Sequence, residues 1–344
     1  MKPGNAAVLI LGALSFLPLR QQQPTYSVKV AEVQIAAQVK DKNGRSIADL
    51  QKEDFILQEE SKPQEIEYFA RQSDLALTLG LLVDTSMSQR QVLPEERRAS
   101  LQFFQQVLRP DKDLAFVISF DFEAKLLEDL TSDLGRLDNS LRDVELPGSR
   151  PAPGNRGRGG GRGGGRGGGG GAGGGGTVLY DAAYLAADDI LRNQTGRKAI
   201  ILISDGVDNG SIEKLEEAVE AVQRADTVIY SIRYFDENVY AGGRSGRGMP
   251  GRRGGRGPGV MRTAVDGKQI LQKLSNETGG SMFEVSRKLS LTEIYSRIQE
   301  ELRSQYIIGY TPSKEDSKTG FRHITLRTKD KNLQVSCRSG YYPR

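Results

Sequence analysis

Two hydrophobic patterns succeed one another along this chain of 344 residues. Near both ends, apolar and polar residues alternate with the two-residue period of a half-buried strand. Between residues 75 and 305, nearly continuous apolar runs are separated by segments whose apolar residues recur at helical spacing. Strands that alternate with helices in this way predict a βαβ sheet with right-handed crossovers. The pattern therefore predicts an α/β region between two antiparallel β segments.

Six strands and the helices between them are expected in the central region. The run LALTLGLLVD (75–84) is nearly all apolar, as expected for a central strand buried on both faces. The predicted order makes a doubly wound, mainly parallel, Rossmann-like sheet. The other strands are expected at 113–121, 124–130, 198–206, 227–235 and 281–286, and the helices at 94–109, 133–144, 177–193, 211–226, 266–280 and 290–305. Ser211 is expected to cap its helix, with Glu213 in the first turn.

The terminal segments predict a small antiparallel β domain. Residues 26–72 contain three alternating runs, the first of which ends in the turn 41–44, whose Asn-Gly pair favours positive φ and predicts a hairpin. Residues 306–344 contain three more, including FRHITLRT and LQVSCRSGYY. Because isolated hairpins are marginally stable, we expect the two segments to pair with each other beside an α/β domain at 75–305.

Residues 1–25 have the features of a leader. An apolar stretch of 14 residues (6–19) lies between Lys2 and Arg20, which is too short to span a bilayer and suits the core of a signal peptide. A retained N-terminal anchor and an incorrectly placed start are the alternatives. No later apolar run approaches 18 residues, so no further membrane span is expected. The leader predicts an exported protein, located in the periplasm, the cell envelope or the extracellular space.

Glycine is concentrated in two tracts, 154–176 and 241–259, within insertions expected at 147–176 and 236–265. The tracts contain no acidic residue and too little apolar surface to offset the entropy of ordering them, so we expect flexible insertions. Nine of the 48 basic residues lie there, which leaves 39 bases against 44 acids elsewhere. Spaced arginines on glycine also suit loose attraction to acidic polymers, but without aromatic residues no specific nucleic-acid partner is expected.

A single cysteine, Cys337, and a single histidine, His323, limit the chemistry that the chain can perform. They exclude an internal disulfide and any zinc site that needs three or four nitrogen or sulfur ligands. They also argue against Ser-His-Asp and Cys-His catalysis, because the one candidate base lies in the alternating run FRHITLRT and is expected to be a strand residue. Any metal must therefore be held by oxygen.

Oxygen-bearing side chains follow the central strands at the edge where doubly wound sheets bind ligands. Asp84, Ser86 and Ser88 form an Asp-x-Ser-x-Ser turn after the first strand, Thr177 follows the first glycine tract, and Asp205 ends another strand. Two carboxylates and three hydroxyls without nitrogen or sulfur favour a hard cation, Mg²⁺ most naturally, with Mn²⁺ or Ca²⁺ as alternatives. We expect Asp84 at a solvent-facing strand end.

The turn alone has a simpler interpretation, in which its Asp or Ser caps the helix expected from residue 94. Against this, DTSMS, TVLYDA and LISDGVD together resemble, in order and context, the metal-ion-dependent adhesion site (MIDAS) of von Willebrand factor A domains. The resemblance covers about 75–305 and implies that Ser86, Ser88 and Thr177 are hydroxyl ligands, while Asp84 and Asp205 hold the cation directly or through water. Asp208 would support these ligands from behind. The leader and the terminal segments are similar to bacterial exported proteins of the same family, best known from Acidobacteria.

In that family the protein leaves a coordination position open, which a carboxylate from a partner protein can complete. The resemblance therefore implies a non-enzymatic, metal-dependent adhesion module. Two other functions stay open: a phosphate-handling hydrolase on a similar sheet with Asp84 as nucleophile, and a metal-free structural protein of the envelope. Haloacid-dehalogenase-type hydrolases carry a second Asp two residues after the first, where this chain has Ser86. The sequence does not predict the oligomeric state.

Overall fold

The structure of the chain is a computed structural model. It describes residues 33–71, 75–86, 89, 92–144, 176–234, 259–312 and 320–343, with only the backbone for 259–266. The leader, Ser88 and most of both glycine-rich insertions lie outside these ranges. Within them, every helix is too short or too polar to cross a lipid bilayer.

A six-stranded sheet forms the centre of the α/β region. Its strand order is β10-β9-β8-β5-β6-β7, and every neighbouring pair is parallel except β6 with β7. Adjacent parallel strands end at the same edge, so the ends of β5 and β8 lie together. The mainly parallel, doubly wound sheet is confirmed. Its strands are β5 (Leu77–Asp84), β6 (Leu114–Phe120), β7 (Ala124–Thr131), β8 (Arg197–Ser204), β9 (Val228–Arg233) and β10 (Met282–Glu284).

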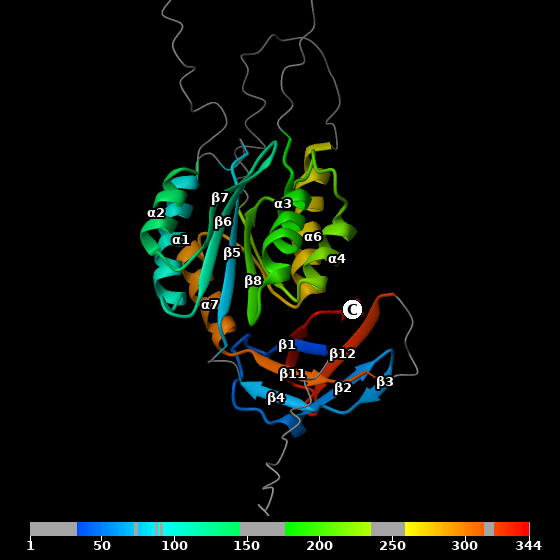
Figure 1. The fold of residues 1–344 in the computed structure, drawn as a ribbon. Coiled ribbons are helices and arrows are strands. Elements are labelled where there is room, and N and C mark those ends of the chain that lie inside the picture. Colours follow the sequence, from blue (N-terminus) through cyan, green and yellow to red (C-terminus); the bar gives the residue numbers. More distant parts are fainter. Residues whose placement is uncertain are drawn as a thin grey trace, which may run out of the picture. The chain divides into compact units, whose positions relative to one another are not determined.

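Helices cover both faces of this sheet, as Figure 1 shows, and each face has its own apolar core. On one face lie α1 (Leu93–Val107), α2 (Leu134–Arg142) and α7 (Leu291–Arg303). On the other lie α3 (Leu179–Leu185, continued by irregular helical turns to Asn193), α4 (Leu215–Arg224) and α6 (Gly259–Thr278). Because both faces are packed, β5 is buried at every position, which explains its continuous apolar sequence.

Two helix starts differ from expectation. Helix α4 begins at Leu215 with Lys214 at its N-cap, so the prediction that Ser211 caps it was wrong. The Ser211 hydroxyl instead accepts hydrogen bonds from the backbone N–H groups of Tyr180 and Asp181 at the start of α3. Helix α6 begins at Gly259, inside the range expected for the second insertion, because the good helix formers after that glycine were hidden by the biased composition beside them.

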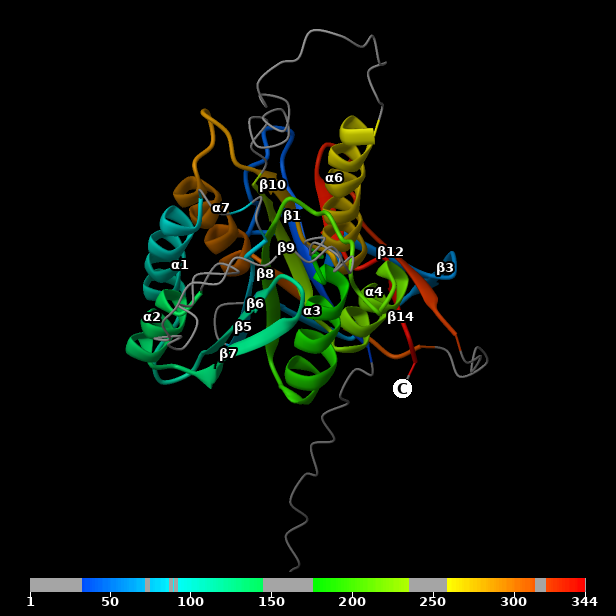
Figure 2. The same ribbon diagram turned by 90° about the horizontal axis from the view of Figure 1, so that it is seen from above.

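The terminal segments interleave in two antiparallel sheets, as expected. The first has the order β13-β1-β11-β4 and the second β14-β12-β2-β3, so each combines strands from both ends of the chain. Figure 2 shows β12 and β14 on the side of the central sheet that carries α4 and α6. The N-terminal strands are β1 (Val33–Lys40), β2 (Phe55–Glu59), β3 (Lys62–Gln64) and β4 (Tyr68–Arg71), with a short 3-10 helix at Lys52–Asp54; the C-terminal strands are β11 (Tyr306–Tyr310), β12 (Arg322–Thr328), β13 (Gln334–Cys337) and β14 (Gly340–Tyr341).

The turn after β1 forms as predicted, with Gly44 at positive φ, but the hairpin does not. Only the single bridge between Lys40 and Ser46 follows the turn, and β1 pairs instead with β11 and β13. The alternating side chains of β1 explain the choice. Val33, Ile35, Ala37 and Val39 need an apolar partner surface, which Tyr306, Ile308 and Tyr310 of β11 supply.

A buried ion pair connects the two terminal segments inside this β region. Glu59 at the end of β2 accepts a hydrogen bond from Arg322 Nη1 of β12 at 2.6 Å, and both side chains are almost fully buried. The Tyr310 hydroxyl donates to the second Glu59 oxygen, also at 2.6 Å. Because an unpaired buried charge is costly, the pair makes each segment depend on the other.

Gly80 in the middle of β5 has no room for a side chain. It lies directly across from Phe116 of β6, and a Cβ atom at residue 80 would be 2.4 Å from the Cζ atom of that ring. We therefore expect Gly80→Ala to lower the free energy of unfolding by about 1–3 kcal/mol through overpacking. Urea denaturation measures the change, and adding Phe116→Leu should recover part of it. An unchanged unfolding midpoint for Gly80→Ala would contradict this packing.

Candidate metal centre

The ends of β5 and β8 bring two aspartates to one edge of the central sheet. Val83 pairs with Ile203, so the next residues, Asp84 and Ser204, are neighbours across the two strands. The Ser204 hydroxyl donates a hydrogen bond of 2.6 Å to Asp84 Oδ2, and Asp205 follows directly. Edge position alone therefore places both predicted carboxylates close together, Asp84 as the last residue of β5 and Asp205 as the first residue after β8.

Asp84 is buried, not solvent-facing as expected, with 1% of its surface exposed. Its Oδ1 accepts a hydrogen bond from the backbone N–H of Ser86 at 2.9 Å, which folds the turn back onto the strand end. The turn does not cap the following helix, because the N-cap of α1 is Val92 and no side chain caps it. The capping interpretation was therefore wrong.

Asp205 is also buried, and its Oδ1 accepts a hydrogen bond from the backbone N–H of Val207 at 2.9 Å. Burial and the neighbouring Asp205 charge raise the pKa of Asp84 to about 7, against hydrogen bonds from Ser204 and Ser86 that lower it. Two like charges held this close in a buried place repel each other unless a proton or a cation lies between them. The donor set at this edge therefore fits a hard divalent cation.

Thr177 lies in the loop that leads into α3, and it too is buried. Its carbonyl oxygen accepts a hydrogen bond from Asn209 N–H in the loop after β8, at 3.0 Å. The next residue, Val178, donates its N–H to the carbonyl of Asp121 in the loop after β6, at 2.9 Å. Three loops are thus tied together around the predicted threonine ligand. Ser86 is partly exposed beside them, and Ser88 lies outside the described residues.

Asp208 organises the same loops, which extends its expected supporting role. Its Oδ1 accepts hydrogen bonds from Leu179 N–H at 2.8 Å and from the Ser211 hydroxyl at 2.6 Å. Asp208 therefore satisfies an unpaired N–H at the start of α3 from the loop that also carries Asp205. The spacing between Thr177 and Asp205 depends on this contact.

Sequence reasoning missed two further residues near the edge. Ser204, the hydroxyl partner of Asp84, directly precedes Asp205 in the motif, where the sequence pattern indicates only a strand residue. Glu96 in the first turn of α1 is 1% exposed, and neither of its carboxylate oxygens has a hydrogen-bond partner in the described part of the chain. Burial, with the nearby Asp84 charge as second cause, holds the pKa of Glu96 well above its usual range. No signal in the sequence distinguished Glu96, because it and Glu95 are both acidic residues of a helix's first turn, where such residues are common.

Neither remaining candidate forms a catalytic centre. His323 is an exposed residue of β12, which confirms its assignment to a strand. Burial raises the pKa of the Cys337 thiol to about 11, so the nucleophilic thiolate is disfavoured. Across the described ranges, no three Asp, Glu, His or Cys side chains gather as metal ligands, so a cation at Asp84 and Asp205 also needs hydroxyl oxygens.

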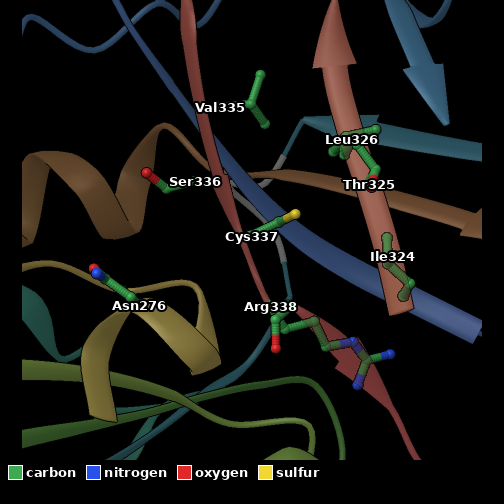
Figure 3. Close-up of a pocket in the computed structure, with 10 residues that line it drawn as sticks. Asn276, Ile324, Thr325, Leu326, Val335, Ser336, Cys337 and Arg338 are labelled. Carbon is green, nitrogen blue, oxygen red and sulfur yellow. The ribbon is translucent and has the colours of Figure 1, made fainter. Parts of the chain in front are cut away.

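A cavity of about 320 Å³ lies elsewhere, between the end of α6 and strands β12 and β13. Figure 3 shows Cys337 beside Ile324 and Leu326, with Arg338 the charged residue of the lining. None of the five predicted ligands lines it. The cavity is therefore distinct from the candidate metal centre.

Neither a family model nor a curated protein matches the sequence. Among solved structures the chain is similar to an aerotolerance-related membrane protein from Bacteroides fragilis, with 14% identity, a TM-score of 0.41, and coverage of 66% of this chain and 98% of that one. It is also similar to BatB from Bacteroides thetaiotaomicron, with 17% identity, a TM-score of 0.38, and coverage of 66% and 97%. A third similar structure is the proximal thread matrix protein 1 of the mussel byssus with a zinc-occupied MIDAS motif, with 15% identity and a TM-score of 0.45. The match covers 72% of this chain and 50% of the mussel protein, so it spans only half of that protein's length.

Proposed function

We propose that this protein is a non-enzymatic binding module that holds a divalent cation between Asp84 and Asp205 and uses it to bind a carboxylate of a partner protein. The observation that carries the proposal is the adjacency of these two buried carboxylates at the carboxyl edge of the sheet. Neutralising both charges with a cation removes their repulsion, while the surrounding hydroxyls supply further oxygen ligands.

Each predicted ligand has a role in this proposal. Asp84 and Asp205 supply negative charge, directly or through water, and Ser86, Ser88 and Thr177 supply hydroxyl oxygens. When bound, Mg²⁺, or Mn²⁺ or Ca²⁺ in its place, supplies positive charge and an open coordination position. The protein itself orients the ligands through the contacts of Ser204 and Asp208. Binding through the open coordination position breaks no bond of the partner.

The proposal also includes the wider identity of the chain. The order of DTSMS, TVLYDA and LISDGVD supports a von Willebrand factor A region at 75–305, joined to a β domain made of 26–72 and 306–344. The apolar stretch at 6–19 supports export, to the periplasm, the envelope or the outside of a bacterial cell. Binding to a protein ligand at the cell surface would suit that location.

Calorimetric titration with Mg²⁺, Mn²⁺, Ca²⁺ and Zn²⁺ tests the cation site directly; Zn²⁺ is included because of the mussel structure's zinc. We expect wild type to give a saturable binding heat with at least one of them, and Asp84→Asn to give none. Asn keeps the size of the side chain and its hydrogen-bonding capacity, so circular dichroism should show the fold unchanged. Equal heats for the two proteins would refute the metal assignment.

A further inference from the structure

Two large apolar side chains are exposed at the edge that carries the candidate metal centre. Ile212, in the loop between β8 and α4, has 90% of its surface exposed, and Phe122, in the loop between β6 and β7, has 53%. The fold does not require an apolar residue at either exposed position, since a polar residue would be solvated there at no cost. Exposed apolar residues beside a binding site are typical of a contact surface.

Both side chains belong to loops that contact the loop carrying Thr177. A Cβ atom on Gly176 would lie 3.9 Å from Phe122 Cδ1 and 3.8 Å from the Gly210 Cα atom, so these three residues pack closely. The backbone N–H of Ile212 donates to the Asp181 carboxylate at 3.0 Å, in the first turn of α3. The backbone that carries each apolar side chain is therefore held in place beside the threonine.

The charged groups on the same loops are mainly acidic. In the described part of these loops the acids are Asp121, Glu123, Asp208 and Glu213, with Asp181 beside them in the first turn of α3, and the bases are Lys125 and Lys214, of which Lys125 pairs with Glu123 at 2.7 Å. Such a surface repels a run of acidic residues, although a single carboxylate can still reach a cation. The charge of the described part of these loops thus opposes a polyanionic ligand, and apolar contact remains as the means of selection.

We propose that the partner of this edge is a protein segment in which one Asp or Glu is flanked by large apolar side chains, which pack on Phe122 and Ile212 while the carboxylate reaches the metal. This inference rests on the proposed function and adds the class of partner to it. A contact between a carboxylate and a cation does not by itself discriminate between partner proteins, because acidic residues are common on protein surfaces. The two apolar contacts supply the missing specificity.

Short fluorescent peptides test this preference by polarisation in saturating Mg²⁺. The first carries one Asp between two Leu–Phe pairs, the second has Ser in place of each apolar residue, the third has Asn in place of Asp, and the fourth is a run of Asp. We expect the first to bind wild type about tenfold more tightly than the second, and the third and fourth to bind weakly.

The double variant Phe122→Ser, Ile212→Ser should lose this tenfold preference and keep the calorimetric heat of metal binding. Ile56→Ser on β2 is the matched control, since Ile56 is an exposed apolar residue of the antiparallel sheets and should leave the preference intact. Equal binding of the first two peptides, tightest binding of the Asp run, or an unchanged preference in the double variant would overturn the inference. A missing metal heat in wild type would instead refute the proposed function.

Discussion

Asp205→Asn should raise the stability of the metal-free protein and abolish its response to metal. In chelator, the variant loses one of two adjacent buried charges, and with it the repulsion that, after burial, is the second cause of the raised pKa of Asp84. In wild type, a divalent cation at about 100 times its Kd should stabilise the fold by about 2.7 kcal/mol, since it binds the folded state alone. For a protein of this size that free energy corresponds to a rise in Tm of roughly 5 °C or more.

Differential scanning calorimetry of wild type and variant, each with chelator and with Mg²⁺, measures both effects. Glu123→Gln is the matched control, because Glu123 lies at the same edge with its side chain 66% exposed and should not alter the response. A lower Tm for Asp205→Asn in chelator would show that repulsion between the two carboxylates does not destabilise the metal-free protein. A retained Mg²⁺ response in the variant would remove Asp205 from the ligand set.

Cutting the chain after Gln305 should unfold the N-terminal β strands and leave the α/β region folded. The cut removes β11 and β13, which are the ladder partners of β1, and β12, the partner of β2. It also removes six large buried side chains from the shared core, Tyr306, Ile308, Tyr310, Ile324, Leu326 and Tyr341. At about 1.5–3 kcal/mol for each, the loss is on the order of 10 kcal/mol, comparable to the whole stability of a domain.

Limited proteolysis followed by mass spectrometry measures this effect. We expect rapid cleavage between residues 33 and 71 in the 1–305 protein and resistance between 92 and 144. Removing only Pro343 and Arg344, which follow β14, is the control and should leave cleavage as in the full chain. Equal resistance of 33–71 in the 1–305 protein would show that the N-terminal strands fold independently, against the two-domain division proposed above.

The strands and helices of the α/β region were predictable because each of them keeps the same pattern of burial, on one face or on both, along its whole length. Continuous apolar sequence in β5 follows from helices on both faces of the sheet, and the stripe in α1 follows from one buried face. The same reasoning located Asp84 and Asp205 at the carboxyl edge, since their positions at the ends of two parallel strands depend only on strand direction.

Where the sequence-based expectations were wrong, a side chain had two possible partners and tertiary contacts chose between them. Ser211 was suited to cap α4 by its position, but the start of α3 lies closer to its hydroxyl. Residues 33–40 were suited to a local hairpin, but β11 offers a larger apolar surface. A local sequence pattern carries no information about an alternative contact partner that is distant in sequence.

The order of apolar runs was thus sufficient to establish the class of fold, because the sequence of each helix or strand shows by itself whether one or both of its faces are buried. The oxygen-bearing residues near the ends of those runs also indicated a set of candidate ligands by type. Their electrostatic state was decided only in three dimensions: the burial of Asp84, the hydroxyl of Ser204 beside it, and the charge of Asp205 across the strands. These terms depend on distances between segments about 120 residues apart, and such distances arise only when the sheet is assembled.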